Sequence, residues 1–113
     1  MSWEGIDTVK TIPKLTAATC VIRNTAARKG RTRSVTPGDS AARHLHYGRV
    51  ILDSGHAPVR FETGILETGL IGLRGEAAIL VDGARSDLGR YDSLYVPRDS
   101  FIEISPGPSG CDL

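Results

Sequence analysis

Short apolar runs recur along the chain, separated by glycine, proline, aspartate or serine. They follow one another roughly every ten residues, and no segment has a long apolar pattern at helical spacing. The alternation of apolar and polar positions is clearest in Leu94-Tyr95-Val96 and Phe101-Ile102-Glu103-Ile104. The pattern predicts strands over Thr16–Arg23, Tyr47–Leu52, Val59–Glu62, Leu70–Leu73, Ala77–Val81, Ser93–Val96 and Phe101–Ile104.

The breaks between these runs carry turn-forming residues. Asp82-Gly83 follows Ile79-Leu80-Val81 and predicts a two-residue hairpin, because both positions of that turn need a positive φ. Further turns are predicted at Asp53-Ser54-Gly55, Arg74-Gly75-Glu76 and Pro106-Gly107-Pro108. Many short strands at even spacing predict an all-β fold, either a sandwich or a barrel.

The length of the chain limits its organisation. A sequence of 113 residues has room for one two-sheet core. We therefore expect a single domain over residues 1–113, with an N-terminal strand and a basic loop in residues 1–34 and the barrel core in residues 35–113. Asn24–Arg33 carries no large apolar side chain and is expected to be a mobile loop.

The charges balance over the whole chain but not along it. Residues 1–50 carry nine Lys and Arg against three Asp and Glu (+6), and residues 51–113 carry five against ten (−5), which gives a net charge of +1. Folding should let the halves compensate each other, so we expect no field that attracts nucleic acid. The cluster from Arg28 to Arg33 lacks interleaved aromatic residues, and we interpret it as a solvated loop. A module associated with nucleic acid is the weakest alternative.

The cysteines and the N-terminus contain no targeting or redox signal. Cys20 and Cys111 match no metal or redox spacing, and the apolar run around Cys20 predicts a small core residue. The first residues show no basic region followed by an apolar stretch, and the apolar runs are far shorter than a membrane span. We expect a cytoplasmic protein that has no membrane partner.

From Val35 onward, an ordered set of short motifs covers about two-thirds of the chain. The set consists of Val35-Thr36-Pro37, the run from Tyr47 to Leu52, Gly55, Phe61-Glu62-Thr63-Gly64, Glu67, Leu73-Arg74-Gly75, Asp82-Gly83 and Leu94-Tyr95-Val96-Pro97. Together they resemble the first cupin domain of the 5-deoxy-glucuronate isomerase family of inositol catabolism. One departure is the position of the family's tryptophan after the Thr-Pro motif, where Arg43 and His44 stand.

The resemblance implies a fold and an activity. The expected fold is a cupin-like double-stranded β-helix, incomplete at its C-terminus because the chain stops at Leu113, where the family begins another strand. Such an end is expected to leave an exposed edge strand that pairs with another chain, as a homodimer or with a partner cupin domain. Family members interconvert an aldose-type uronic acid and its ketose, and their divalent metal is associated with the second cupin domain.

Two functions follow from this resemblance. The first is that the chain would correspond to the half of an isomerase-type protein that holds no cofactor of its own, and we expect it then to serve dimerisation or to support a catalytic domain. The alternative is a free-standing, metal-free cupin that binds a small sugar acid without catalysis.

The residues at the expected metal-ligand positions are unusual. Alignment on Glu67 and Leu73-Arg74-Gly75 puts the usual His-x-His pair at Arg60 and Glu62, and the third histidine position at Ile102. A guanidinium cannot ligate a cation, so we expect no metal here. Arg60, Glu62 and Glu67 could instead line the barrel mouth and bind a sugar acid, with Arg60 as the carboxylate fork. The alternative is an internal Arg–Glu pair that fills a polar barrel interior.

Two other groups of residues are candidates for a functional site. His44 and His46 are two residues apart, and on a strand they would share one face and could bind a metal. No carboxylate follows them closely, and His56 falls in a predicted turn, so we interpret the pair as surface histidines. Tyr91 and Tyr95 are interpreted as packing residues because no neighbour in the sequence is expected to lower their pKa.

Overall fold

The computed structural model describes residues 16–113, and this part of the chain is mostly antiparallel β-structure. It contains one short helix, α2 (Ala17–Cys20). The strands are β1 (Gly30–Val35), β2 (Tyr47–Leu52), β3 (Val59–Glu62), β4 (Thr68–Ile71), β5 (Arg74–Val81), β6 (Ala84–Leu88), β7 (Ser93–Val96) and β8 (Phe101–Asp112). The predicted all-β class is confirmed. Among residues 16–113 there is no apolar helix of membrane-spanning length.

The described residues group into two compact units. One comprises residues 16–25 and 33–48, and the other comprises residues 26–32 and 49–113. The second unit contains strands β3 to β8 and every side chain of the main hydrophobic cluster.

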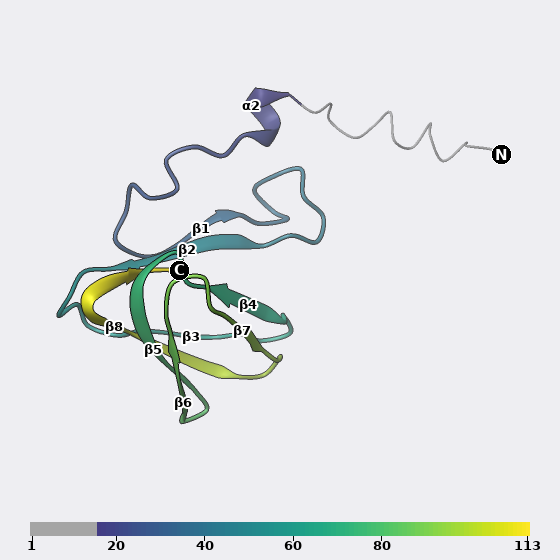
Figure 1. Cartoon of the computed structure of the whole chain (residues 1–113). Coiled ribbons are helices and arrows are strands. Elements are labelled where there is room, and N and C mark those ends of the chain that lie inside the picture. Colours follow the sequence, from purple (N-terminus) through teal and green to yellow (C-terminus); the bar gives the residue numbers. More distant parts are fainter. Residues whose placement is uncertain (1–15) are drawn as a thin grey trace. The chain divides into compact units, whose positions relative to one another are not determined.

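The C-terminal strand β8 organises the larger of the two sheets (Figure 1). The strand order of that sheet is β1-β2-β8-β5-β6, and β3 also pairs with β8. Residues Phe101–Ile104 of β8 pair with β3, while Cys111 and Asp112 pair with β2 on one side and β5 on the other. The expectation that the chain end forms an exposed edge is therefore wrong, because the last strand lies in the interior of the sheet. A smaller sheet consists of β4 and β7.

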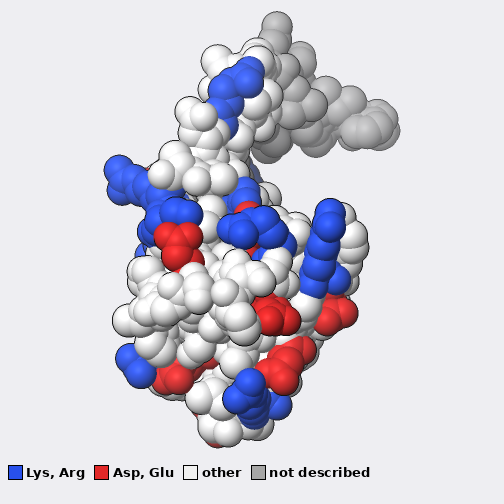
Figure 2. Space-filling model, turned by 60° about the vertical axis from the view of Figure 1, so that its left-hand side comes forward, with Lys and Arg blue, Asp and Glu red and all other residues white. Residues whose placement is uncertain are grey.

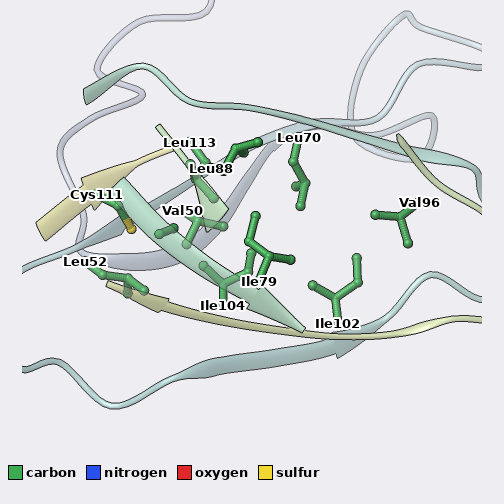
Figure 3. Close-up of a cluster of buried hydrophobic side chains, with 11 residues drawn as sticks. Val50, Leu52, Leu70, Ile79, Leu88, Val96, Ile102, Ile104, Cys111 and Leu113 are labelled. Carbon is green, nitrogen blue, oxygen red and sulfur yellow. The ribbon is translucent and has the colours of Figure 1, made fainter. Parts of the chain in front are cut away.

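The hydrophobic core lies between the two sheets of the second unit (Figure 3). Leu70 and Val96 of the smaller sheet point toward Ile79, Ile102 and Ile104 of the larger one. Alternate residues of a strand face opposite sides of its sheet, so the period-two pattern of β7 and β8 produces this arrangement. Each fully buried aliphatic side chain contributes about 1.5–3 kcal/mol to the free energy of unfolding.

The strands predicted after residue 46 are present, three of them with the predicted bounds, and the predicted strands Ala77–Val81 and Phe101–Ile104 lie inside the longer strands β5 and β8. Val59–Glu62 and Ser93–Val96 are strands with the predicted bounds, and so is Tyr47–Leu52. The Asp82-Gly83 turn is confirmed, with φ of 49° and 86° at its two residues. The strand predicted at Leu70–Leu73 begins two residues earlier and ends at Ile71.

Two predicted turns are wrong because a β-bulge replaces them. Arg74-Gly75-Glu76 begins β5, and Pro106-Gly107-Pro108 lies within β8. Gly75 is opposite Cys111 and Ala77 is opposite Pro106, so four residues of β8 face only Glu76. A bulge tolerates proline and positive φ inside a strand, which explains why turn-forming residues occur there. Gly75 itself has a φ of 69°.

The N-terminal predictions differ most from the structure. Thr16–Arg23 is not a strand, because Thr16 and Thr19 form a capping box that begins helix α2. Cys20 is exposed and is not a core residue. The predicted loop Asn24–Arg33 ends inside a strand, since β1 begins at Gly30. The sequence pattern also missed β6, in which Leu88 is the one buried residue.

Positive and negative side chains are mixed on the face of the molecule shown in Figure 2. Lys and Arg lie next to Asp and Glu over the lower part of this view. Mixed charges of this kind produce a weaker long-range field than a patch of one sign.

Candidate functional site

Arg60 and Glu62 lie on the outward face of β3. Val59 and Phe61, which alternate with them, are partly buried against the core, and both charged side chains are exposed. The Arg60 Nε donates a hydrogen bond of 2.8 Å to Oε1 of Glu103, the residue opposite it on β8. The prediction of an internal Arg–Glu pair is therefore wrong. Arg60 pairs with Glu103, and not with Glu62 or Glu67, on the outer face of the sheet.

Glu67 belongs to a different part of the fold. It directly precedes β4, and its Oε1 accepts a hydrogen bond of 3.1 Å from the Tyr95 hydroxyl on β7. The three predicted site residues are thus divided between the two sheets. Arg60 and Glu62 share the outer face of the larger sheet, while Glu67 lies at the edge of the smaller one.

The interpretation of Tyr95 as a packing residue is wrong. Tyr95 is 61% exposed and therefore does not pack in the core. The hydrogen bond to Glu67 raises the pKa of Tyr95 above 10.0, with smaller contributions from desolvation and the Glu67 charge, while the positive charge of Arg98 lowers it. Gly69 lies opposite Tyr95 and has no side chain to cover the ring. Tyr91 is also exposed, so its interpretation as a packing residue is wrong too; the Arg90 guanidinium lies 4.7 Å from its ring centroid.

The expected metal-ligand positions do not fit a metal. Ile102 has no exposed surface and belongs to the hydrophobic core, and Arg60 is a cation held by Glu103. His44 and His46 are exposed and lie in an irregular segment before β2, so a strand does not place them on one face. Within residues 16–113, no group of three His, Cys, Asp or Glu side chains is close enough to bind an ion.

Thr63 joins two loops at one end of the second unit. It is buried, its hydroxyl donates to the Pro97 carbonyl at 2.9 Å, and it accepts the Ser100 backbone N–H at 2.9 Å. Its own N–H donates to the Ser100 carbonyl, also at 2.9 Å, and the Asp99 N–H donates to the Gly64 carbonyl at 2.7 Å. These bonds satisfy the polar groups of a buried threonine and fix the loop that follows Tyr95.

Two residues of the basic segment 28–33, Lys29 and Arg31, contact other residues of the second unit. Lys29 forms an exposed ion pair of 3.0 Å with Asp53. The Arg31 guanidinium lies 3.8 Å from the ring centroid of Phe61, a cation–π distance. These contacts link Lys29 to the turn after β2 and Arg31 of β1 to β3, whereas the sequence predicts a solvated loop here.

Comparison of the chain with models of known protein families gives no match, and comparison with curated proteins gives none either. These comparisons therefore give no support to the expected resemblance to the isomerase family, which stays a prediction from the motifs in this sequence. Two of these motifs, Thr63-Gly64 and Tyr95-Val96-Pro97, are adjacent in the structure through the hydrogen bond from Thr63 to Pro97.

Proposed function

We propose that this chain is the metal-free cupin half of a 5-deoxy-glucuronate isomerase-type protein, and that it supports a catalytic cupin domain. The observation that carries the proposal is the environment of the aligned ligand positions. Ile102 is fully buried in the core, and Arg60 forms an outward ion pair with Glu103. Two antiparallel sheets around one core and the ordered motifs agree with a cupin-type architecture.

The chemistry of the isomerisation explains why a partner domain is needed. Converting an aldose-type uronic acid to its ketose moves a proton between adjacent carbons, which requires a base and an electrophile that polarises the carbonyl. In this chain the charge of Arg60 is directed to Glu103, and Glu67 accepts a hydrogen bond from Tyr95 on the other sheet. These residues are not arranged as a base next to an electrophile.

Metal analysis and an activity assay of the purified full chain test this proposal. We expect no stoichiometric manganese, iron or zinc, and no conversion of 5-deoxy-glucuronate observed by NMR with or without these metals. A neighbouring reading frame that encodes a cupin with a His-x-His motif would supply the catalytic domain, and adding that domain should produce turnover. Metal-dependent turnover by this chain alone, lost in His44→Ala, would contradict the proposal and identify His44-Leu45-His46 as the site.

Binding of a sugar acid without catalysis is a second candidate function, favoured by the surface around Tyr95. An exposed aromatic ring can stack against the C–H face of a sugar, and the Glu67 carboxylate can accept a hydrogen bond from a sugar hydroxyl. The positive charge of Arg98, which acts on the Tyr95 hydroxyl, is suited to attract a ligand carboxylate.

Titration of the chain with D-glucuronate, followed by NMR shifts, tests this second function. We expect the shifts to centre on β4 and β7 and to disappear in Tyr95→Ala. Tyr91→Ala is the matched control, since Tyr91 is an exposed tyrosine that contacts Arg90 instead. Equal binding by both variants, or shifts centred on Arg60, would exclude the Tyr95 surface.

A further inference from the structure

Strand β6 is an open edge of the larger sheet. It pairs with β5 in the register Val81↔Ala84 to Ala77↔Leu88, and it ends the strand order of that sheet among residues 16–113. Figure 1 shows it in the hairpin whose turn projects below the neighbouring strands. Residues 84 to 87 are all exposed. An edge of this kind presents backbone groups that can pair with another strand.

The hairpin geometry identifies the residues that present these groups. Val81 and Ala84 close the two-residue turn as a hydrogen-bonded pair, and hydrogen-bonded and non-hydrogen-bonded pairs alternate from there. Ala84, Ser86 and Leu88 therefore direct their backbone N–H and C=O groups toward β5. Those of Arg85 and Asp87 point to the open edge.

The side chains of the same two residues carry opposite charges. Arg85 Nε donates to Asp87 Oδ1 at 2.9 Å, and the two side chains are 65% and 73% exposed. Both lie on the outer face of the sheet, opposite in direction to the buried Leu88. The edge thus presents one cation and one anion, two residues apart.

We propose that β6 is a self-complementary docking edge for a second copy of this chain, which pairs with it antiparallel about Ser86. In this register Arg85 is opposite Asp87 of the second copy, and Asp87 is opposite its Arg85. Each of these two pairs exchanges two backbone hydrogen bonds, so all the outward groups of Arg85 and Asp87 are used. Opposite charges directly across an antiparallel pair are stabilising.

Charge selects this register over its symmetric neighbours. Pairing about Arg85 would place two arginines opposite each other, and pairing about Asp87 would place two aspartates opposite each other, both of which are destabilising. The register about Ser86 instead brings Ser86 against Ser86, a pair of small side chains. A five-residue strand buries little surface, so the dimer is expected to be reversible and weakened by salt.

Sedimentation equilibrium of the full chain tests the proposal. It compares wild type with two variants that reverse one charge each and with a double variant in which the two charges are exchanged. Wild type is expected to form a reversible dimer. Asp87→Arg and Arg85→Asp each place like charges opposite one another, and each should weaken dimerisation about tenfold or more. The double variant, Arg85→Asp with Asp87→Arg, should restore it. An equimolar mixture of the two single variants should form a heterodimer, because each then meets its opposite charge.

The mixture separates an interface from an effect on the fold, since a contact within one chain cannot be restored by a second chain. Asp53→Arg is the matched control, because it makes the same charge change at an exposed ion pair remote in sequence from β6, and it should leave the dimer intact. Circular dichroism checks that each variant is folded. A monomeric wild type, a dimer unaffected by the single variants, or no heterodimer in the mixture would overturn the proposal.

Discussion

Arg49 and Asp112 form a bidentate ion pair although they are 63 residues apart in the sequence. The Arg49 Nε donates to Asp112 Oδ1 at 3.0 Å and Nη2 donates to Oδ2 at 2.6 Å, and each side chain is only 14% exposed. Val50 and Leu113, the next residues of both segments, exchange backbone hydrogen bonds of 3.1 and 2.9 Å. The pair therefore attaches the end of the chain to β2.

Removing the charge of Asp112 should destabilise the protein. We expect Asp112→Asn to lower the free energy of unfolding by about 2 kcal/mol, because the hydrogen bonds involve charged and largely buried groups. Asp53→Asn removes the same charge from the exposed pair with Lys29 and should cost less than about 1 kcal/mol. Urea unfolding of the three proteins measures the difference, and equal losses in both variants would contradict this interpretation.

Gly75 should tolerate no side chain. Its φ is 69°, and a Cβ built there would overlap the carbonyl oxygen of Gly110 on β8. Gly75→Ala is expected to cost about 3 kcal/mol or more, of which about 1–2 kcal/mol is the strain of a positive φ. Gly55→Ala is the control, because Gly55 has a φ of 82° but open space around the added Cβ. Thermal unfolding should show a clearly larger loss for Gly75→Ala, and similar losses would exclude the steric contribution.

The hydrogen bond from Tyr95 to Glu67 should be visible in a pH titration. The hydrogen bond raises the pKa of the Tyr95 hydroxyl in the folded protein. The protonated hydroxyl therefore contributes fully to the stability of the protein below pH 10.0, and this contribution is lost as the pH rises through the folded-state pKa of Tyr95. In Glu67→Ala, one of the three tyrosines should ionise at lower pH, as measured by tyrosinate absorbance. Glu62→Ala removes an exposed carboxylate from the other sheet and should leave the titration unchanged. A curve unaltered by Glu67→Ala would show that the hydrogen bond is not populated in solution.

The two cysteines should differ in reactivity. Cys20 is exposed, whereas Cys111 is buried in the core and desolvation raises the pKa of its thiol. Because the thiolate is the reactive form, we expect one equivalent of a thiol reagent to react quickly in the native protein and the second only after unfolding. Mass spectrometry identifies the site, and Cys20→Ser should abolish the fast reaction. Rapid modification of Cys111 in the native state would mean that this end of the core opens readily.

Local pattern was sufficient for the all-β class and for strands whose side chains alternate cleanly. Val59–Glu62 and Ser93–Val96 were predicted with their observed bounds because one face of each packs on the core. The Asp82-Gly83 turn was predictable because this turn needs a positive φ at both positions, and Asp-Gly is one of the few residue pairs that adopt it readily. Such features can be recognised within a short window of the sequence.

Tertiary structure decided the features that depend on distant residues. Glu103 pairs with Arg60 across 43 positions, and Asp112 pairs with Arg49 across 63, so no sequence window contains either pair. Turn-forming residues at 106–108 remain inside β8 because the bulge opposite Glu76 accommodates them. The edge strand β6 lacks the alternating apolar residues of a strand that packs one face on the core, and only its pairing with β5 identifies it as a strand. Composition and periodicity thus determined the class of the fold, whereas strand order determined which charged residues meet, because that order alone brings remote segments within hydrogen-bonding distance.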